Sequence, residues 1–162
     1  GRANLVYRFG SEDSPPLKLR LKIEINTREH FTAQGAVRVP FRVENPWFNG
    51  EAEVATYTLD ELLCTKFRAL YQRKKGRDLF DLWHALEVGH ADPKTLLSCF
   101  ERYMLEEGRA VTRAQFEANL ARKRAEPDFR DDVEPLLRPG FSWDIDAAVD
   151  VVLRSLVARL SA

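Results

Sequence analysis

The stretch TLDELLCTKFRALYQRKKGRDLFDLW, residues 58–83, predicts two helices that meet at a tight turn. Its first part repeats leucine at a helical period behind Thr58, a residue type that favours helix N-caps. Glu61 follows three residues later, so the spacing predicts a capping box. The second part begins near Arg77 and is again apolar at a helical period, with Gly76 at the turn. A helical hairpin therefore opens the second half of the chain.

Six basic residues fall within residues 66–77, with no acid among them. Lys66 lies on the apolar stripe of the first helix, and Arg73 follows two turns later on the same side. Both cations can therefore point toward one anionic partner, such as a phosphate. In the alternative reading, Lys66 packs its methylene groups on the core and extends its ammonium group into water.

Two aspartates follow this basic run at the start of the second helix. Arg77 and Asp81 are spaced i,i+4, and Asp78 and Asp81 are spaced i,i+3, so all three are predicted to cluster on one helix turn. A purely structural reading accounts for each pair, because acids stabilise a helix N-terminus and an Arg–Asp pair supports a helix. Together with Lys66, the cluster predicts a site with phosphate-binding groups and carboxylates suited to a base or a metal.

Alternating apolar and polar residues in the first half predict strands. KLRLKIEIN, residues 18–26, is the clearest case, and VRVPFRVE, residues 37–44, repeats it with Pro40 favouring an edge position. Weaker patterns predict a third strand and a short fourth, at residues 3–10 and 52–56. On the polar face, Glu24 is placed to ligate a divalent ion, or to form an ion pair with a neighbouring cation.

The second half continues with helical patterns at residues 93–105, 112–125 and 147–160. We therefore predict an α+β fold, with a mostly antiparallel sheet of three to four strands followed by a bundle of about five helices. The strand-rich part is expected over residues 1–57 and the helical part over 58–162, packed as one unit with the sheet.

Composition excludes several classes of protein. The 25 basic residues balance the 25 acidic residues, so net charge predicts no attraction to nucleic acid or membrane. Cys64 and Cys99 lack the spacing of a zinc site and are expected to be reduced core thiols. No apolar run is long enough for a membrane span, and the protein is expected to be cytoplasmic.

Two segments together, LRLKIEINTREHF at residues 19–31 and the helical hairpin of residues 58–83, resemble the AbiEii-type nucleotidyltransferase toxins. These toxins belong to the polymerase-beta-like nucleotidyltransferase superfamily, and the resemblance covers roughly residues 3–88. It implies that Lys66 contacts a nucleoside triphosphate and that Asp78 and Asp81 are catalytic, with Asp81 favoured.

The same resemblance implies that Glu24 contributes to a metal site. It also implies that three cations bind nucleotide phosphates: Lys22, Arg73 and Arg77. The complete enzyme is expected to transfer a nucleoside monophosphate from an NTP to an acceptor, with RNA the favoured acceptor and Mg²⁺ the cofactor. A cognate antitoxin is the expected functional partner.

The superfamily's Gly-Ser turn and the strand Asp-x-Asp motif behind it are expected upstream of residue 1. Gly10-Ser11 is followed instead by Pro15-Pro16 and a basic strand. We therefore expect the chain to be the C-terminal part of such an enzyme, inactive alone.

Two alternative functions remain open. A metal-dependent nuclease usually carries Glu-x-Lys on its strand, whereas the order here is Lys22-Ile23-Glu24. A non-enzymatic nucleic-acid- or protein-binding domain would instead show salt-dependent RNA binding that ignores NTP and Mg²⁺.

Overall fold

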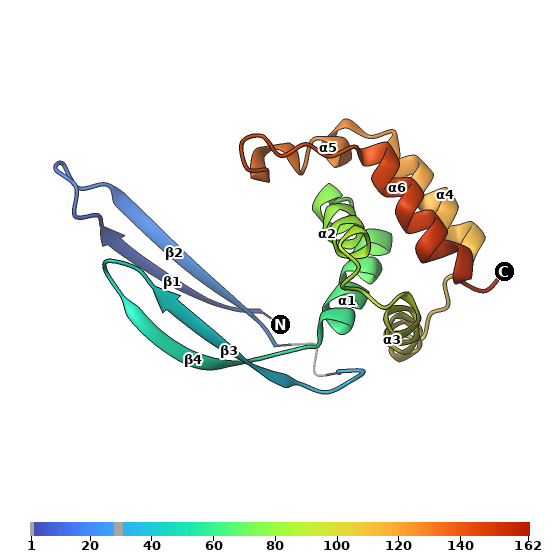
Figure 1. Cartoon of the computed structure of the whole chain (residues 1–162), viewed down its shortest axis with the longest axis horizontal. Coiled ribbons are helices and arrows are strands. Elements are labelled where there is room, and N and C mark those ends of the chain that lie inside the picture. Colours follow the sequence, from blue (N-terminus) through green and yellow to red (C-terminus); the bar gives the residue numbers. More distant parts are fainter. Residues whose placement is uncertain (1, 28–30) are drawn as a thin grey trace. The chain divides into compact units, whose positions relative to one another are not determined.

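The computed structural model of the chain describes residues 2–27 and 31–162 (Figure 1). The chain divides into two compact units, Gly1–Phe31 and Thr32–Ala162. Strands occupy the N-terminal part, and helices follow from Leu59 onward. The α+β class predicted from the sequence is confirmed.

The first unit is a hairpin of β1 (Arg2–Gly10) and β2 (Lys18–Asn26). The strands are antiparallel, with Leu5 opposite Ile23 and Tyr7 opposite Leu21. Directly opposed residues share a face, so this register gathers the alternating apolar residues on one face and the polar residues on the other. The predicted alternation thus matches the observed pairing.

The second hairpin pairs β3 (Val37–Glu44) with β4 (Asn49–Thr56), also antiparallel. Its turn is closed by the Asn45 side chain, whose Oδ1 accepts the backbone N–H groups of Trp47 and Phe48 at 3.0 Å. Pro40 has a partner strand on one side only, which suits a residue without an N–H group. The described strands form two separate two-stranded sheets, β1–β2 and β3–β4.

Six α-helices and two short 3₁₀-helices follow. Their bounds are α1 (Leu59–Gln72), α2 (Gly76–Glu87), α3 (Pro93–Glu106), α4 (Arg113–Arg124), α5 (Pro127–Arg130), η1 (Glu134–Leu136), α6 (Ile145–Ser155) and η2 (Val157–Arg159). Helix α1 contacts α2 and α3, and α2 contacts α6 (Figure 1). The packing of the sheet and the helices as one unit stays a prediction.

Aromatic rings from three helices pack together in the core of the helical part. Phe67 of α1 stacks on Phe116 of α4 with ring centroids 4.4 Å apart, and the Phe100 ring of α3 meets Phe67 edge-on at 4.8 Å. Cys64 and Cys99 are free and buried, as predicted, and burial raises the pKa of both thiols. Among the described residues, no helix is long and apolar enough to cross a membrane.

The helix starts follow the sequence signals, with one exception. At the start of α4, Thr112 and Gln115 form a capping box. At α1, the Thr58 side chain accepts the backbone N–H of Glu61, but the Glu61 carboxylate bonds elsewhere. The capping box predicted there is therefore wrong, because Glu61 is buried and binds residues 32–34 and Tyr103 instead.

Candidate functional site

The hairpin of α1 and α2 brings the predicted site residues together, and Gly76 makes that hairpin possible. Gly76 is buried as the first residue of α2. A Cβ atom placed there would lie 2.2 Å from the backbone oxygen of Phe129 in α5. Only glycine permits this close approach, so the turn is fixed by packing against a segment far along the chain.

Lys66 of α1 lies between the two aspartates of α2. Its ammonium nitrogen is 2.7 Å from Asp81 Oδ2 and 3.6 Å from Asp78 Oδ1. The Lys66 and Asp81 side chains are 36% and 41% exposed, so this pair remains open to a ligand. Lys66 is therefore held by carboxylates, and the alternative in which it only extends into water does not describe it.

Asp78 differs from Asp81 in its burial. Its side chain is fully buried and receives two hydrogen bonds from Arg73, from Nε at 2.7 Å and from Nη2 at 2.8 Å. This two-point geometry is the strong form of an Arg–carboxylate pair, and the hydrogen bonds to Asp78 raise the pKa of Arg73. Asp78 therefore anchors Arg73 and helps to position Lys66, while Asp81 faces outward.

The predicted contact between Arg77 and Asp81 is wrong. Arg77 instead pairs with Asp132, to which its Nε lies at 3.2 Å and its backbone N–H donates at 3.2 Å. Lys75 contacts the same carboxylate at 3.3 Å. Burial opposes ionisation of Asp132, but the hydrogen bonds from Arg77 and Lys75 outweigh it and lower the pKa of this carboxyl. A partner 55 residues away has displaced the local i,i+4 partner.

Every cation of residues 66–77 has an acidic partner. The partners of four of them, Lys66, Arg73, Lys75 and Arg77, are given above. Of the other two, Arg68 lies 3.2 Å from Glu107, and Lys74 lies 2.7 Å from Glu126. The acids come from α2, from the C-cap of α3 and from the residues on either side of α5. The basic run seen in the sequence is thus neutralised in the folded chain.

Lys22 and Glu24 lie on β2, in the first unit. Their side chains form an ion pair with one another, and the hydrogen bond from Lys22 is the main cause that lowers the pKa of Glu24. The ion-pair alternative for Glu24 is therefore what the structure shows. The structure assigns both residues to a different unit from Lys66 and the aspartates.

Two buried charges were missed in the sequence. Glu61 accepts four hydrogen bonds, including one from the backbone N–H of Ala33 and one from Tyr103 Oη at 2.8 Å. Lys123 of α4 donates to the last carbonyl groups of α1, at Leu70 and Tyr71. Lys123 lies on an apolar stripe of α4 with Phe116 and Leu120. A lysine on an apolar stripe, the signal that identified Lys66, could therefore have revealed the burial of Lys123.

A family model for the nucleotidyl transferase AbiEii toxin of a type IV TA system matches residues 2–151. The chain belongs to this family. Comparisons with curated proteins and with solved structures gave no match. The AbiEii match extends well past residue 88, where the sequence motifs end, and so includes most of the helices. Membership makes nucleotidyl transfer the general chemistry and implies a cognate antitoxin.

The described carboxylates of this AbiEii chain do not fit a Mg²⁺ site by themselves. No group of three or more His, Cys, Asp or Glu side chains in residues 2–27 and 31–162 is arranged to hold a metal. Asp78 and Asp81 both face cations. The segment Asp144-Ile145-Asp146 has the Asp-x-Asp order, but its carboxylates are already engaged. Asp144 is the N-cap of α6, and Asp146 pairs with arginines of α4 and α5.

Two cavities adjoin the Lys66–Asp81 pair. One, of about 510 Å³, lies between α2 and residues 133–141 and includes Arg77, Phe80 and Arg138 in its lining. The other, of about 380 Å³, lies between α1 and α2 and includes Lys66 and the apolar Leu62. Asp81 and His84 line both cavities. The open carboxylate is therefore accessible from two sides.

Proposed function

We propose that the complete protein transfers a nucleoside monophosphate from an NTP to an acceptor hydroxyl at an RNA end. The observation that supports this most is the half-exposed Lys66–Asp81 pair beside two cavities, positioned by the buried Asp78. A lysine and an aspartate that open onto cavities are suited to bind a phosphate and to accept a proton.

Lys66 is the proposed phosphate-contacting group. In the transfer, the acceptor oxygen attacks the α-phosphorus while the bond from that phosphorus to pyrophosphate breaks. Negative charge develops on the leaving pyrophosphate, and a fixed ammonium group nearby stabilises it. Because Lys66 already contacts both aspartates, its position is set before the nucleotide arrives.

Asp81 is the proposed catalytic carboxylate, and Asp78 is a positioning residue. Asp81 is 41% exposed and can accept the proton that the acceptor hydroxyl loses. Asp78 has no exposed surface, so it cannot reach a substrate without unpacking. It acts through Arg73 and Lys66, whose side chains it orients.

The other predicted residues keep their roles within the proposal. Arg73 contacts Asp78 through Nε and Nη2, so Nη1 is available to a phosphate oxygen, and Arg77 is 45% exposed beside Asp132. Lys22 is assigned to a phosphate and Glu24 to a metal ion. The two side chains pair with one another, so this ion pair must break before either can bind its ligand. Mg²⁺ belongs to the proposal for the complete enzyme, but the steps assigned to Lys66, Asp78 and Asp81 do not depend on it.

The test is transfer of label from each α-labelled NTP to total cellular RNA. Two proteins are compared: this chain, and a protein that begins at the first codon of the reading frame. The Lys66→Ala and Asp81→Ala variants of each are tested as well. We expect incorporation by the longer protein alone and a loss of about 10²-fold or more in both variants. Lys94→Ala, which removes an exposed cation of α3, is the matched control and should retain the rate.

Label incorporated equally by the Lys66 and Asp81 variants would contradict the assignment of the site. Salt-dependent RNA binding with no transfer by either length would favour the non-enzymatic binding domain. Neutralisation of the basic run already counts against that alternative, because paired cations attract RNA phosphates weakly.

A further inference from the structure

The 510 Å³ cavity between α2 and residues 133–141 combines aromatic rings with arginines. Phe80 and His84 of α2 lie with their rings nearly parallel, at 12° and 5.9 Å between centroids. Phe141 approaches Phe80 edge-on at 5.9 Å and keeps 42% of its surface exposed. All three residues line the cavity, and aromatic rings are the groups on which a base can stack.

The arginines give the same cavity a cationic side. Arg138 is exposed, lines the cavity and has no ion pair within the described part of the chain. Arg77 lines it as well, although Asp132 shares its charge. Asp81 is the acidic residue of the lining, and it is paired with Lys66. An anionic group is therefore favoured here.

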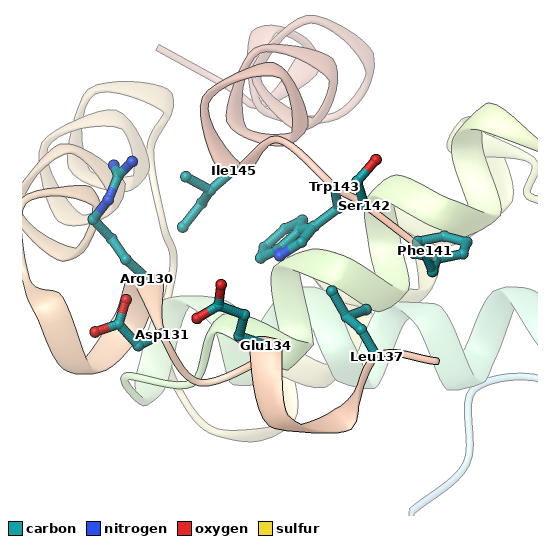
Figure 2. A pocket seen from close by; sticks show the side chains of 8 residues that line it. All are labelled: Arg130, Asp131, Glu134, Leu137, Phe141, Ser142, Trp143 and Ile145. Atoms are coloured by element: carbon teal, nitrogen blue, oxygen red, sulfur yellow. The ribbon is translucent and has the colours of Figure 1, made fainter. Parts of the chain in front are cut away.

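The neighbouring cavity is a poorer anion site. It has a volume of about 320 Å³ and shares Leu137 and Phe141 with the first, but Asp131 and Glu134 contribute to its lining (Figure 2). Figure 2 shows these two carboxylates on the side of the cavity nearer Arg130, whose guanidinium group already contacts Asp146. Carboxylates repel phosphate, so the two cavities differ in the ligand they favour.

We propose that the cavity between α2 and residues 133–141 binds a nucleotide, with its base stacked on the exposed Phe141 ring, beside Phe80 and His84, and its phosphates toward Arg138. A base stacked on aromatic side chains and a phosphate bound by arginine are the two contacts that nucleotide sites combine. The volume falls within the range of small-molecule sites, about 300–1,000 Å³. Asp81 connects this cavity to Lys66, so the inference rests on the proposed function.

The natural tryptophans provide a direct readout. Trp83 and Trp143 lie 5.7 and 5.5 Å from the Phe80 ring, measured between centroids. Trp47 lies in the β3–β4 turn and is 86% exposed, so Trp47→Phe leaves only the two reporters near the cavity. A base bound beside Phe80 should change their emission.

The experiment titrates this Trp47→Phe chain with each of the four NTPs, with tripolyphosphate as a ligand without a base, and with short oligoribonucleotides. Arg138→Ala and Phe141→Ala are each expected to weaken nucleotide binding about 5- to 150-fold, the range for loss of one stacked base or one charged contact. Phe141→Leu keeps apolar volume without an aromatic face and should also weaken binding. Arg159→Ala, an exposed arginine outside the three cavities described, is the control.

The ligands separate the two sources of a nucleotide. Tighter binding of an NTP than of the oligoribonucleotides assigns the cavity to the donor nucleotide, and the reverse order assigns it to the end of the RNA acceptor. Equal affinities of wild type, Arg138→Ala and Phe141→Ala, each shown to be folded by its melting curve, would overturn the inference, as would the absence of binding. Arg138-dependent nucleotide binding by this chain, together with no transfer by the longer protein, would instead contradict the proposed function alone.

Discussion

Asp78 and Asp81 are three residues apart on one helix, yet their side chains lie in different environments. Asp78 is fully buried with two hydrogen bonds from Arg73, and Asp81 is 41% exposed with Lys66 as its partner. The chemistry of the two side chains is identical, so burial and partners make the difference. Mutating each should therefore affect different properties of the protein.

We expect Asp78→Asn to lower the free energy of unfolding by about 2 kcal/mol, because it removes charge from buried hydrogen bonds. Asp81→Asn should lower it by less than about 1 kcal/mol, since an exposed ion pair contributes little. Urea denaturation followed by circular dichroism measures both. Similar losses of stability in the two variants would contradict the proposed division between a positioning and a catalytic aspartate.

At the scale of elements, Glu61 joins three parts of the second unit. Its carboxylate connects α1 to residues 32–34 and to Tyr103 of α3. Burial opposes ionisation, but these hydrogen bonds outweigh it and lower the pKa of Glu61 from 4.5. The ionised carboxylate is therefore a structural group that fixes the segment entering the second hairpin.

The lowered pKa gives a pH dependence with a definite sign. The unfolded chain binds the proton more tightly, so the contribution of Glu61 is complete above pH 4.5 and is lost as pH falls through the lower folded pKa. Glu61→Gln should cost about 2 kcal/mol at pH 7, because its amide group faces backbone donors. Denaturation between pH 7 and pH 3 should show the gap between wild type and variant narrowing only below pH 4.5. A gap that stays constant to pH 3 would contradict this role.

Tertiary partners explain where sequence and structure differ among the elements. The 3.6-residue period predicted α1 and α2, and the stripe on α1 marked Lys66, because both signals are local. Arg77 was assigned to Asp81 by local spacing, whereas Asp132 is brought to it by the packing of α5 on Gly76. Pairing of the strands into two hairpins also depends on contacts that alternation alone does not specify.

At the scale of the whole molecule, the buried residues are distributed unevenly. Every core residue found buried in the described chain lies at position 33 or later. In the first hairpin, Leu21 and Tyr7 are 51% and 53% exposed. A two-stranded hairpin is marginally stable in water, so the stability of this chain resides in its second unit.

We therefore expect residues 32–162 to fold without the first hairpin. The truncated chain should keep a cooperative thermal transition, with a midpoint within about 5 °C of the intact chain, a shift that corresponds to about 1 kcal/mol. Circular dichroism at 222 nm measures the transition, and near-ultraviolet spectra report on the packed aromatic rings. Loss of a cooperative transition would show that the first hairpin contributes to the core.

The pairing of every cation in residues 66–77 with a carboxylate has a consequence for how anionic ligands approach this protein. Paired charges cancel one another within a few ångströms, so the stretch projects little electric field into the surrounding solvent. Polyanions are not drawn toward it from a distance, and a collision must already place the ligand correctly. The face around Lys66 is thus arranged for discrimination at contact, at the expense of rapid capture.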